Sequence, residues 1–158
     1  MKDLVSYDNP QGCINNDYIE LVALVLQEAT FTSIRTNPTW RALFTKSNNI
    51  PSVTWTFREA STVNLVVAYL ICLQSLVNFQ FNITPSVFYH PGTQNTMADD
   101  SSRKFHLAPE IFLSLYSTTY SPQQSPTIWH ACHPPSKIVS LVIFALRKQP
   151  FDVVTSPV

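Results

Sequence analysis

The stretch YHPGTQNTMADDSSR, residues 89–103, carries the most information about the fold of this chain. It follows an alternating segment rich in β-formers, residues 82–90, which ends at a Pro-Gly pair as a strand running into a turn does. Residues 95–103 are polar and suit a short surface helix that carries Asp99. The pattern therefore predicts a strand, a tight turn and a helix bearing an acid.

Upstream of this stretch, helical and strand-like patterns alternate. The first helix is expected over residues 17–30, with Asp17 as its N-cap and Glu20 three residues later as the partner in a capping box. The other elements expected there are a strand over 4–7, a strand over 40–45, a short helix over 52–59 and a long helix over 62–79. Such an alternation is typical of an α/β fold.

The segment 62–79 contains no charged residue and is close to the length that crosses a membrane. Polar residues interrupt it, among them Asn64, Gln74 and Asn78, and no basic cluster flanks it. We expect a buried core helix, with a membrane-associated protein as the alternative. No apolar run of a secretory signal follows Met1, which predicts an intracellular protein, cytoplasmic or nuclear.

The composition excludes several classes of protein. Only 13% of the 158 residues are charged, and 10 basic residues balance 10 acidic ones, unlike the composition of a disordered charged tail. With 2 glycines in the chain, a Gly-rich phosphate-binding loop is excluded. Three tryptophans, together with Phe57 and Arg58, could form a surface on which nucleic-acid bases stack, although buried aromatic residues are the more common outcome.

Residues 105–158 have a different character and predict a mostly helical extension. Helices are expected over 108–120 and 136–149, the second with Ser136 as its N-cap. A Pro-rich connector, residues 121–135, separates them and contains the sequence HACH. These soft or borderline ligands do not easily converge on one tetrahedral zinc ion, and no CxxC pair accompanies them.

The pattern of residues 89–103 resembles the closing motif of the RNase H domains of long-terminal-repeat and related retroelements. In that motif a strand ends in a Pro-Gly turn and leads into Asn-x-x-Ala-Asp-x-x-Ser-Arg, which Asn95 to Arg103 match. Residues 16–24 are similar to the central helix of the family, and residues 44–49 to a strand end that carries an acid. The resemblance implies a partial RNase H-like fold, in which helices pack on the remnant of a mixed sheet.

The resemblance also implies an activity, the Mg²⁺-dependent hydrolysis of RNA in RNA–DNA hybrids. Two metal ions perform this reaction, and the family holds them with four acids. Glu20 and Asp99 match two of these catalytic metal ligands, while Asn48 stands at the third position and no residue matches the first. The chain is therefore expected to begin at the third strand of the domain, and to have little or no activity.

The resemblance divides the chain into an RNase H-like domain lacking its first strands, residues 1–104, and a connector, residues 105–158. The connector is similar to the segment that follows RNase H in DIRS-type elements. The expected partners are an RNA–DNA hybrid or DNA, and the reverse transcriptase or recombinase domains of the same polyprotein. The alternative is a non-catalytic module that packs on such a domain. An incomplete sheet exposes an edge, so we expect poor solubility of the isolated chain.

Overall fold

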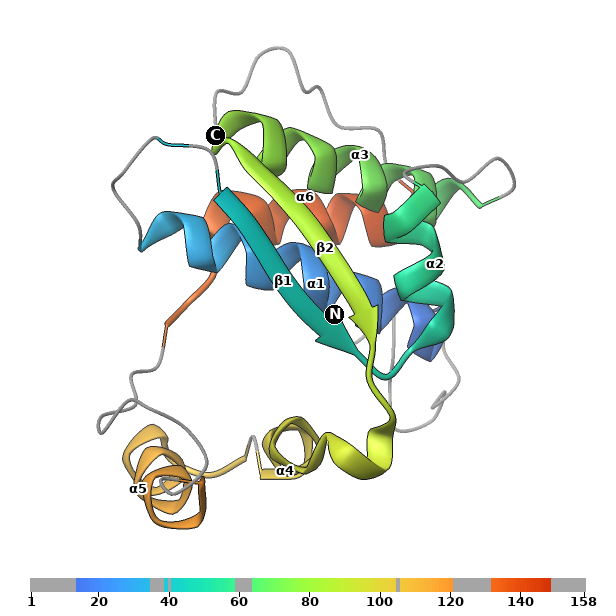
Figure 1. Ribbon diagram of the computed structural model, residues 1–158. Helices are drawn as coiled ribbons and strands as arrows, with labels where there is room; N and C mark the ends of the chain where they lie inside the picture. Colours follow the sequence, from blue (N-terminus) through green and yellow to red (C-terminus); the bar gives the residue numbers. More distant parts are fainter. Residues whose placement is uncertain are drawn as a thin grey trace. The chain divides into compact units, whose positions relative to one another are not determined.

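The computed structural model describes residues 14–34, 39, 41–58, 64–104, 106–120 and 132–148 (Figure 1). In chain order the elements are α1 (Asn16–Ser33), β1 (Arg41–Ser47), α2 (Ile50–Arg58), α3 (Leu65–Gln80), β2 (Ile83–Tyr89), the 3₁₀ helix η1 (Gly92–Gln94), α4 (Thr96–Lys104), α5 (Pro109–Tyr120) and α6 (Ser136–Leu146). The expectation of an α/β protein is confirmed, and helices predominate. The strand expected over 4–7 and most of the connector 121–135 lie outside the described residues.

The chain forms two compact units. The first contains Met1–Tyr89 and Pro134–Val158, and the second contains His90–His133. The first unit includes α6 because this helix packs against α1 and α3. The expected division at residue 104 follows the resemblance to a family and stays a prediction, whereas these units follow contacts in space.

The sheet of the first unit consists of β1 and β2, which pair in parallel with Arg41 opposite Ile83 and Ser47 opposite Tyr89. Parallel neighbours need a long crossover, and α2 and α3 lie between the two strands in the sequence. Along β1, buried and exposed residues alternate. Within the part of the chain that the structure describes, one face of the sheet is therefore covered and the other is open.

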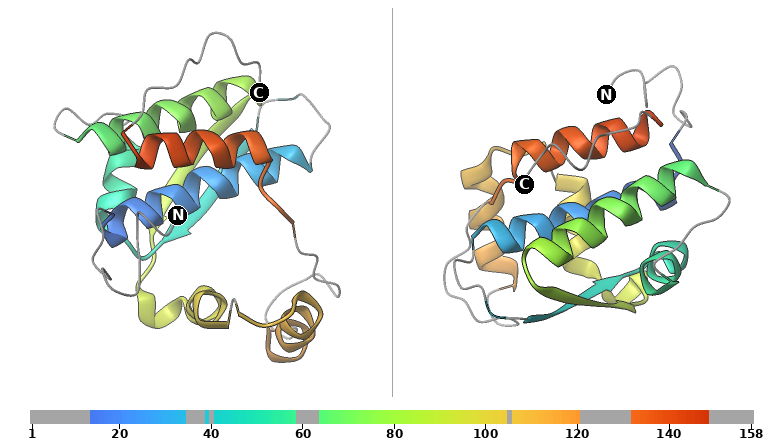
Figure 2. Two further views of the ribbon diagram at one scale, coloured as in Figure 1. Left: turned by 180° about the vertical axis from the view of Figure 1, so that it is seen from behind. Right: turned by 90° about the horizontal axis from the view of Figure 1, so that it is seen from above.

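Helices α1 and α3 lie on the covered face, and α6 lies on the side of these helices away from the sheet (Figure 2). The core forms chiefly between the three helices. Its fully buried members come from all of them and include Leu21, Val25, Val67, Leu70, Leu73, Val77, Ile138 and Ala145. The helices thus stabilise the first unit more than the sheet does.

The apolar segment that raised the question of a membrane forms α3. Asn64 caps this helix, because its Oδ1 accepts hydrogen bonds from the backbone N–H groups of Val66 and Val67 at 3.0 and 3.3 Å. Half of the apolar side chains of α3 are buried in the core, and these include Val67, Leu70 and Leu73, as expected of a core helix. Within the described part of the chain, no helix is both long enough and apolar enough to cross a membrane.

Two helix caps differ from the expectation. Asn15, and not Asp17, caps α1: its backbone is extended, and its Oδ1 accepts a hydrogen bond from Tyr18 N at 3.0 Å. Asp17 lies within the first turn instead. At α6 the N-cap position belongs to Pro135, which has no capping side chain, so Ser136 is the first helical residue and not the cap.

In the second unit, two tyrosines of α5 fasten this helix to α4. The Tyr116 hydroxyl donates to the carbonyl oxygen of Met97 and contacts the Ser101 hydroxyl. The Tyr120 hydroxyl donates to Asp100 Oδ2 at 2.8 Å. Both tyrosines are buried, and the Phe112 ring stacks on Tyr116 with 4.5 Å between ring centroids. Aromatic side chains therefore hold α5 against α4, and the hydroxyls of the two tyrosines are hydrogen-bonded to polar groups of α4.

Candidate functional site

Three chain segments meet in the first unit at the carboxyl end of β1. Asn49, two residues after the end of β1, donates a hydrogen bond from Nδ2 to Asp17 Oδ1 in the first turn of α1, at 2.8 Å. Ser52 of α2 donates from Oγ to the backbone carbonyl oxygen of Asp17 at 3.0 Å. In open α/β sheets, ligands bind outside the carboxyl ends of the strands. This cluster is therefore the first place to look for a site.

Asn49 holds the cluster together. Its Oδ1 accepts a hydrogen bond from the backbone N–H of Ser52 at 2.8 Å, which is the contact of an N-cap and starts α2. Its own backbone N–H donates to Ser47 Oγ at 3.1 Å. The side chain of Asn49 therefore uses its carbonyl for the helix and its NH₂ group for Asp17, and this fixes its orientation.

Glu20 lies one turn beyond Asp17 on α1 and is half-buried. Burial raises the pKa of its carboxyl, and the neighbouring charge of Asp17 raises the pKa further. The two carboxylates are thus close enough to repel each other. Glu20 is one of the residues selected from the sequence, and the structure brings it near Asp17.

The amide selected from the sequence, Asn48, is exposed at the bend after β1, and its neighbour Asn49 contacts α1. The pairing of Asn49 with Asp17 was missed in the sequence. The available signal was the spacing of Asn49 and Ser52, which is that of an N-cap and the third residue of a helix. A bend in the backbone decides which of the two adjacent amides turns inward.

Asp99 belongs to the second unit, whereas Glu20 and Asn48 belong to the first. On α4, Asp99 Oδ2 accepts a hydrogen bond from Arg103 Nε at 2.9 Å, and both side chains are well exposed. Asp100 instead accepts hydrogen bonds from Lys104 Nζ and from the Tyr120 hydroxyl, each at 2.8 Å. Both bonds lower the pKa of Asp100, and the bond from Lys104 has the larger effect. Asp100 is therefore a structural acid, and Asp99 is the acid that faces solvent.

Asp17 and its neighbour Glu20 are the acids of this cluster. Magnesium is held by hard oxygen ligands, chiefly carboxylates. At the end of β1, Asn49 directs an N–H group at Asp17, where a cation would need an oxygen. Among all the described residues, no three His, Cys, Asp or Glu side chains are grouped closely enough to hold a metal.

Comparison with known proteins does not assign a family. No protein-family model, no curated protein and no solved structure matches the chain. The function therefore has to be inferred from residues 89–103 and from the cluster around Asp17 and Asn49.

Proposed function

We propose that this chain is a retroelement RNase H-like domain that no longer hydrolyses RNA. One observation carries the loss of activity: at the carboxyl end of β1, where the resemblance expects an acid, the chain has the amides Asn48 and Asn49, and Asn49 donates a hydrogen bond to Asp17. The resemblance of residues 89–103 to the closing motif of the family supports the origin. Helix α4 begins shortly after the Pro-Gly turn and carries Asp99, whose side chain is exposed.

The chemistry of the family explains why this hydrogen bond matters. Carboxylates around two cations activate a water molecule and stabilise the leaving oxygen. In a cluster of acids without cations, the negative charges repel each other. Here the neutral amide of Asn49 satisfies Asp17 without a cation. Groups that act as one catalytic unit lose most of their effect when a member is lost, so we expect activity to be abolished and not merely reduced.

The direct test is cleavage of a labelled RNA–DNA hybrid by the full chain in millimolar Mg²⁺. We expect no cleavage above that of the Asp99→Ala variant, with Glu20→Gln as a second comparison. Neither substitution removes a buried contact of the core, so both variants should fold. Robust cleavage by the parent chain that disappears in both variants would show that the acids still act together, and would overturn the proposal.

A second test adds a carboxylate at the end of β1, at the amide that contacts Asp17. Asn49→Asp places a third carboxylate beside Asp17 and removes the hydrogen bond between them, while Asp still caps α2. We expect the free energy of unfolding at neutral pH to fall by about 1–2 kcal/mol. Millimolar Mg²⁺ should recover part of this loss, since a ligand that binds only the folded state stabilises it.

Asn48→Asp is the matched control, because it adds the same charge at the exposed neighbouring position. Urea unfolding of both variants, with Mg²⁺ and with EDTA, gives the comparison. Little change is expected for Asn48→Asp in either condition. If Asn48→Asp is the variant that loses stability and responds to Mg²⁺, the cluster around Asn49 is not the remnant of the metal site.

A further inference from the structure

The outer face of the sheet in the first unit carries two exposed, stacked aromatic rings. Phe44 of β1 is 69% exposed and Phe88 of β2 is 52% exposed. Their ring centroids lie 6.1 Å apart, with 23° between the ring planes. In the parallel register Phe44 faces Ser86 and Lys46 faces Phe88, so the two phenylalanines are diagonal neighbours. They form a small apolar surface in contact with solvent.

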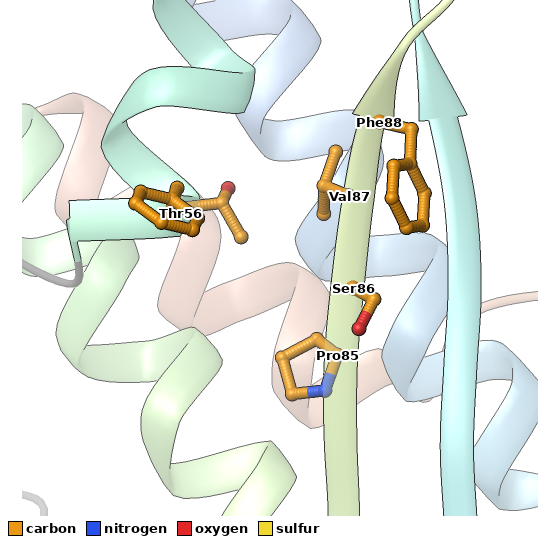
Figure 3. A pocket seen from close by; sticks show the side chains of 6 residues that line it. Thr56, Pro85, Ser86, Val87 and Phe88 are labelled. Carbon is orange, nitrogen blue, oxygen red and sulfur yellow. The ribbon is translucent and has the colours of Figure 1, made fainter.

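A groove of about 310 Å³ continues this surface along the side of β2 that faces α2 (Figure 3). Its walls are formed by Thr56 and Phe57 of α2 and by Pro85, Ser86, Val87 and Phe88 of β2. Phe57 is even more exposed than the two sheet phenylalanines. A third accessible aromatic ring, that of Phe57, therefore lines the same groove as Phe88.

Among the described residues, the charged side chains near this face are basic. Lys46 is exposed on the outer face of β1, and Arg58 is exposed next to Phe57 at the end of α2. In the described part of the first unit every acid, namely Asp17, Glu20 and Glu28, belongs to α1. Helix α1 packs on the opposite, covered face of the sheet. The aromatic face therefore complements a negatively charged ligand.

We propose that this face binds single-stranded nucleic acid, with bases stacked on Phe44 and Phe88 and the phosphate backbone near Lys46 and Arg58. Stacking on exposed aromatic rings beside basic side chains is how proteins hold unpaired strands with little sequence preference. A duplex is excluded as the ligand of the rings because its bases are covered by their neighbours. This binding goes beyond the proposed function, since it involves neither Glu20 nor Asp99.

The residue pattern predicted a different location for such a surface. Of its three tryptophans, Trp55 is half-buried and packs against the core beside Tyr18, at 6.3 Å between ring centroids. Trp40 and Trp129 lie outside the described residues. Of that predicted set, Phe57 and Arg58 are exposed. Phe57 lines the same groove as Phe88 of the sheet.

The test is fluorescence anisotropy of a labelled oligothymidylate titrated with the full chain at low salt. We expect Phe44→Ala and Phe88→Ala each to weaken binding about tenfold. Phe79→Ala is the matched control, because Phe79 is 81% exposed but belongs to α3; its affinity should equal that of the parent. Lys46→Gln should make binding less dependent on salt, whereas Lys148→Gln, two residues after the end of α6, should not.

Thermal melts followed by circular dichroism establish that each variant is folded, as expected for exposed side chains. The proposal is overturned if the parent does not bind the oligonucleotide, or if the two sheet variants bind as tightly as Phe79→Ala. It is also overturned if they bind normally but lose self-association in sedimentation, which would make the face a protein interface. None of these outcomes bears on hybrid cleavage, so the proposed function is tested separately.

Discussion

Replacing Glu28 with glutamine is expected to raise the free energy of unfolding by about 3 kcal/mol above neutral pH. Glu28 lies on α1 and is only 1% exposed. Burial raises the pKa of its carboxyl to about 7, while hydrogen bonds from Gln74 and Asn78 of α3 hold the pKa below what burial alone would give. The bond from Gln74 Nε2 to Glu28 Oε1 measures 2.8 Å.

The direction of the effect follows from the two protonation equilibria. In the unfolded chain the pKa of Glu28 is close to the ordinary value of 4.5, and in the folded chain it is about 7. The folded state therefore keeps its proton to higher pH. This contribution to stability is complete below about pH 4.5 and is lost as the pH rises through about 7. Glutamine carries no charge, so the gain from Glu28→Gln should appear over this range.

The hydrogen bonding around Glu28 gives a second reason to expect stabilisation. Glu28 Oε2 and Asn78 Oδ1 are both buried and have no hydrogen-bond partner among the described residues. Two acceptors without donors in one buried region are costly. Glutamine keeps an oxygen to accept from Gln74, and its NH₂ group adds a donor for the acceptors on α3.

Urea unfolding between about pH 4.5 and about pH 8.5 measures this prediction. Glu20→Gln is the matched control on the same helix. Burial and Asp17 raise the pKa of Glu20 as well, but Glu20 is only half-buried, so its gain at high pH should be smaller. Equal pH dependence in the parent chain and in Glu28→Gln would mean that Glu28 is ionised in the folded state at no cost.

The sequence predicted the order and type of the elements because each one carries its own local pattern. The apolar run in residues 62–79 belongs to a helix buried on many sides, and α3 occupies most of it. The alternating run before His90 became β2. The ends of the helices were predicted less accurately, because a single residue with an extended backbone decides where a helix is capped. At α1 that residue is Asn15, two positions before Asp17.

Contacts between distant segments were not predictable in the same way. The pattern of residues 136–149 predicts a helix with an apolar face, but such a face could pack on many partners. It does not indicate that the helix packs on α1 and α3. The choice between Asn48 and Asn49 depends on one backbone bend. Likewise, the pattern of β1 shows that Phe44 points away from Leu43, but only the position of the helices shows which of the two faces solvent.

The packing of α6 leads to the second large effect. Ile138 of α6 is fully buried in the core that α1 and α3 form with this helix. We expect Ile138→Ala to lower the free energy of unfolding by about 3 kcal/mol, through lost burial and the cavity left behind. For a domain with the usual stability of about 5–15 kcal/mol, this is a large fraction.

Phe144→Ala in the same helix is the matched control, because it removes a larger side chain from an exposed position. Its effect should stay within about 0.5 kcal/mol. Urea unfolding of both variants measures the difference. If the helical circular dichroism signal is lost in a single transition, α6 unfolds together with the rest of the unit. If Ile138→Ala costs no more than Phe144→Ala, α6 is only loosely attached. In that case α1 and α3 must bury their shared apolar faces without it, and the first unit would end at β2.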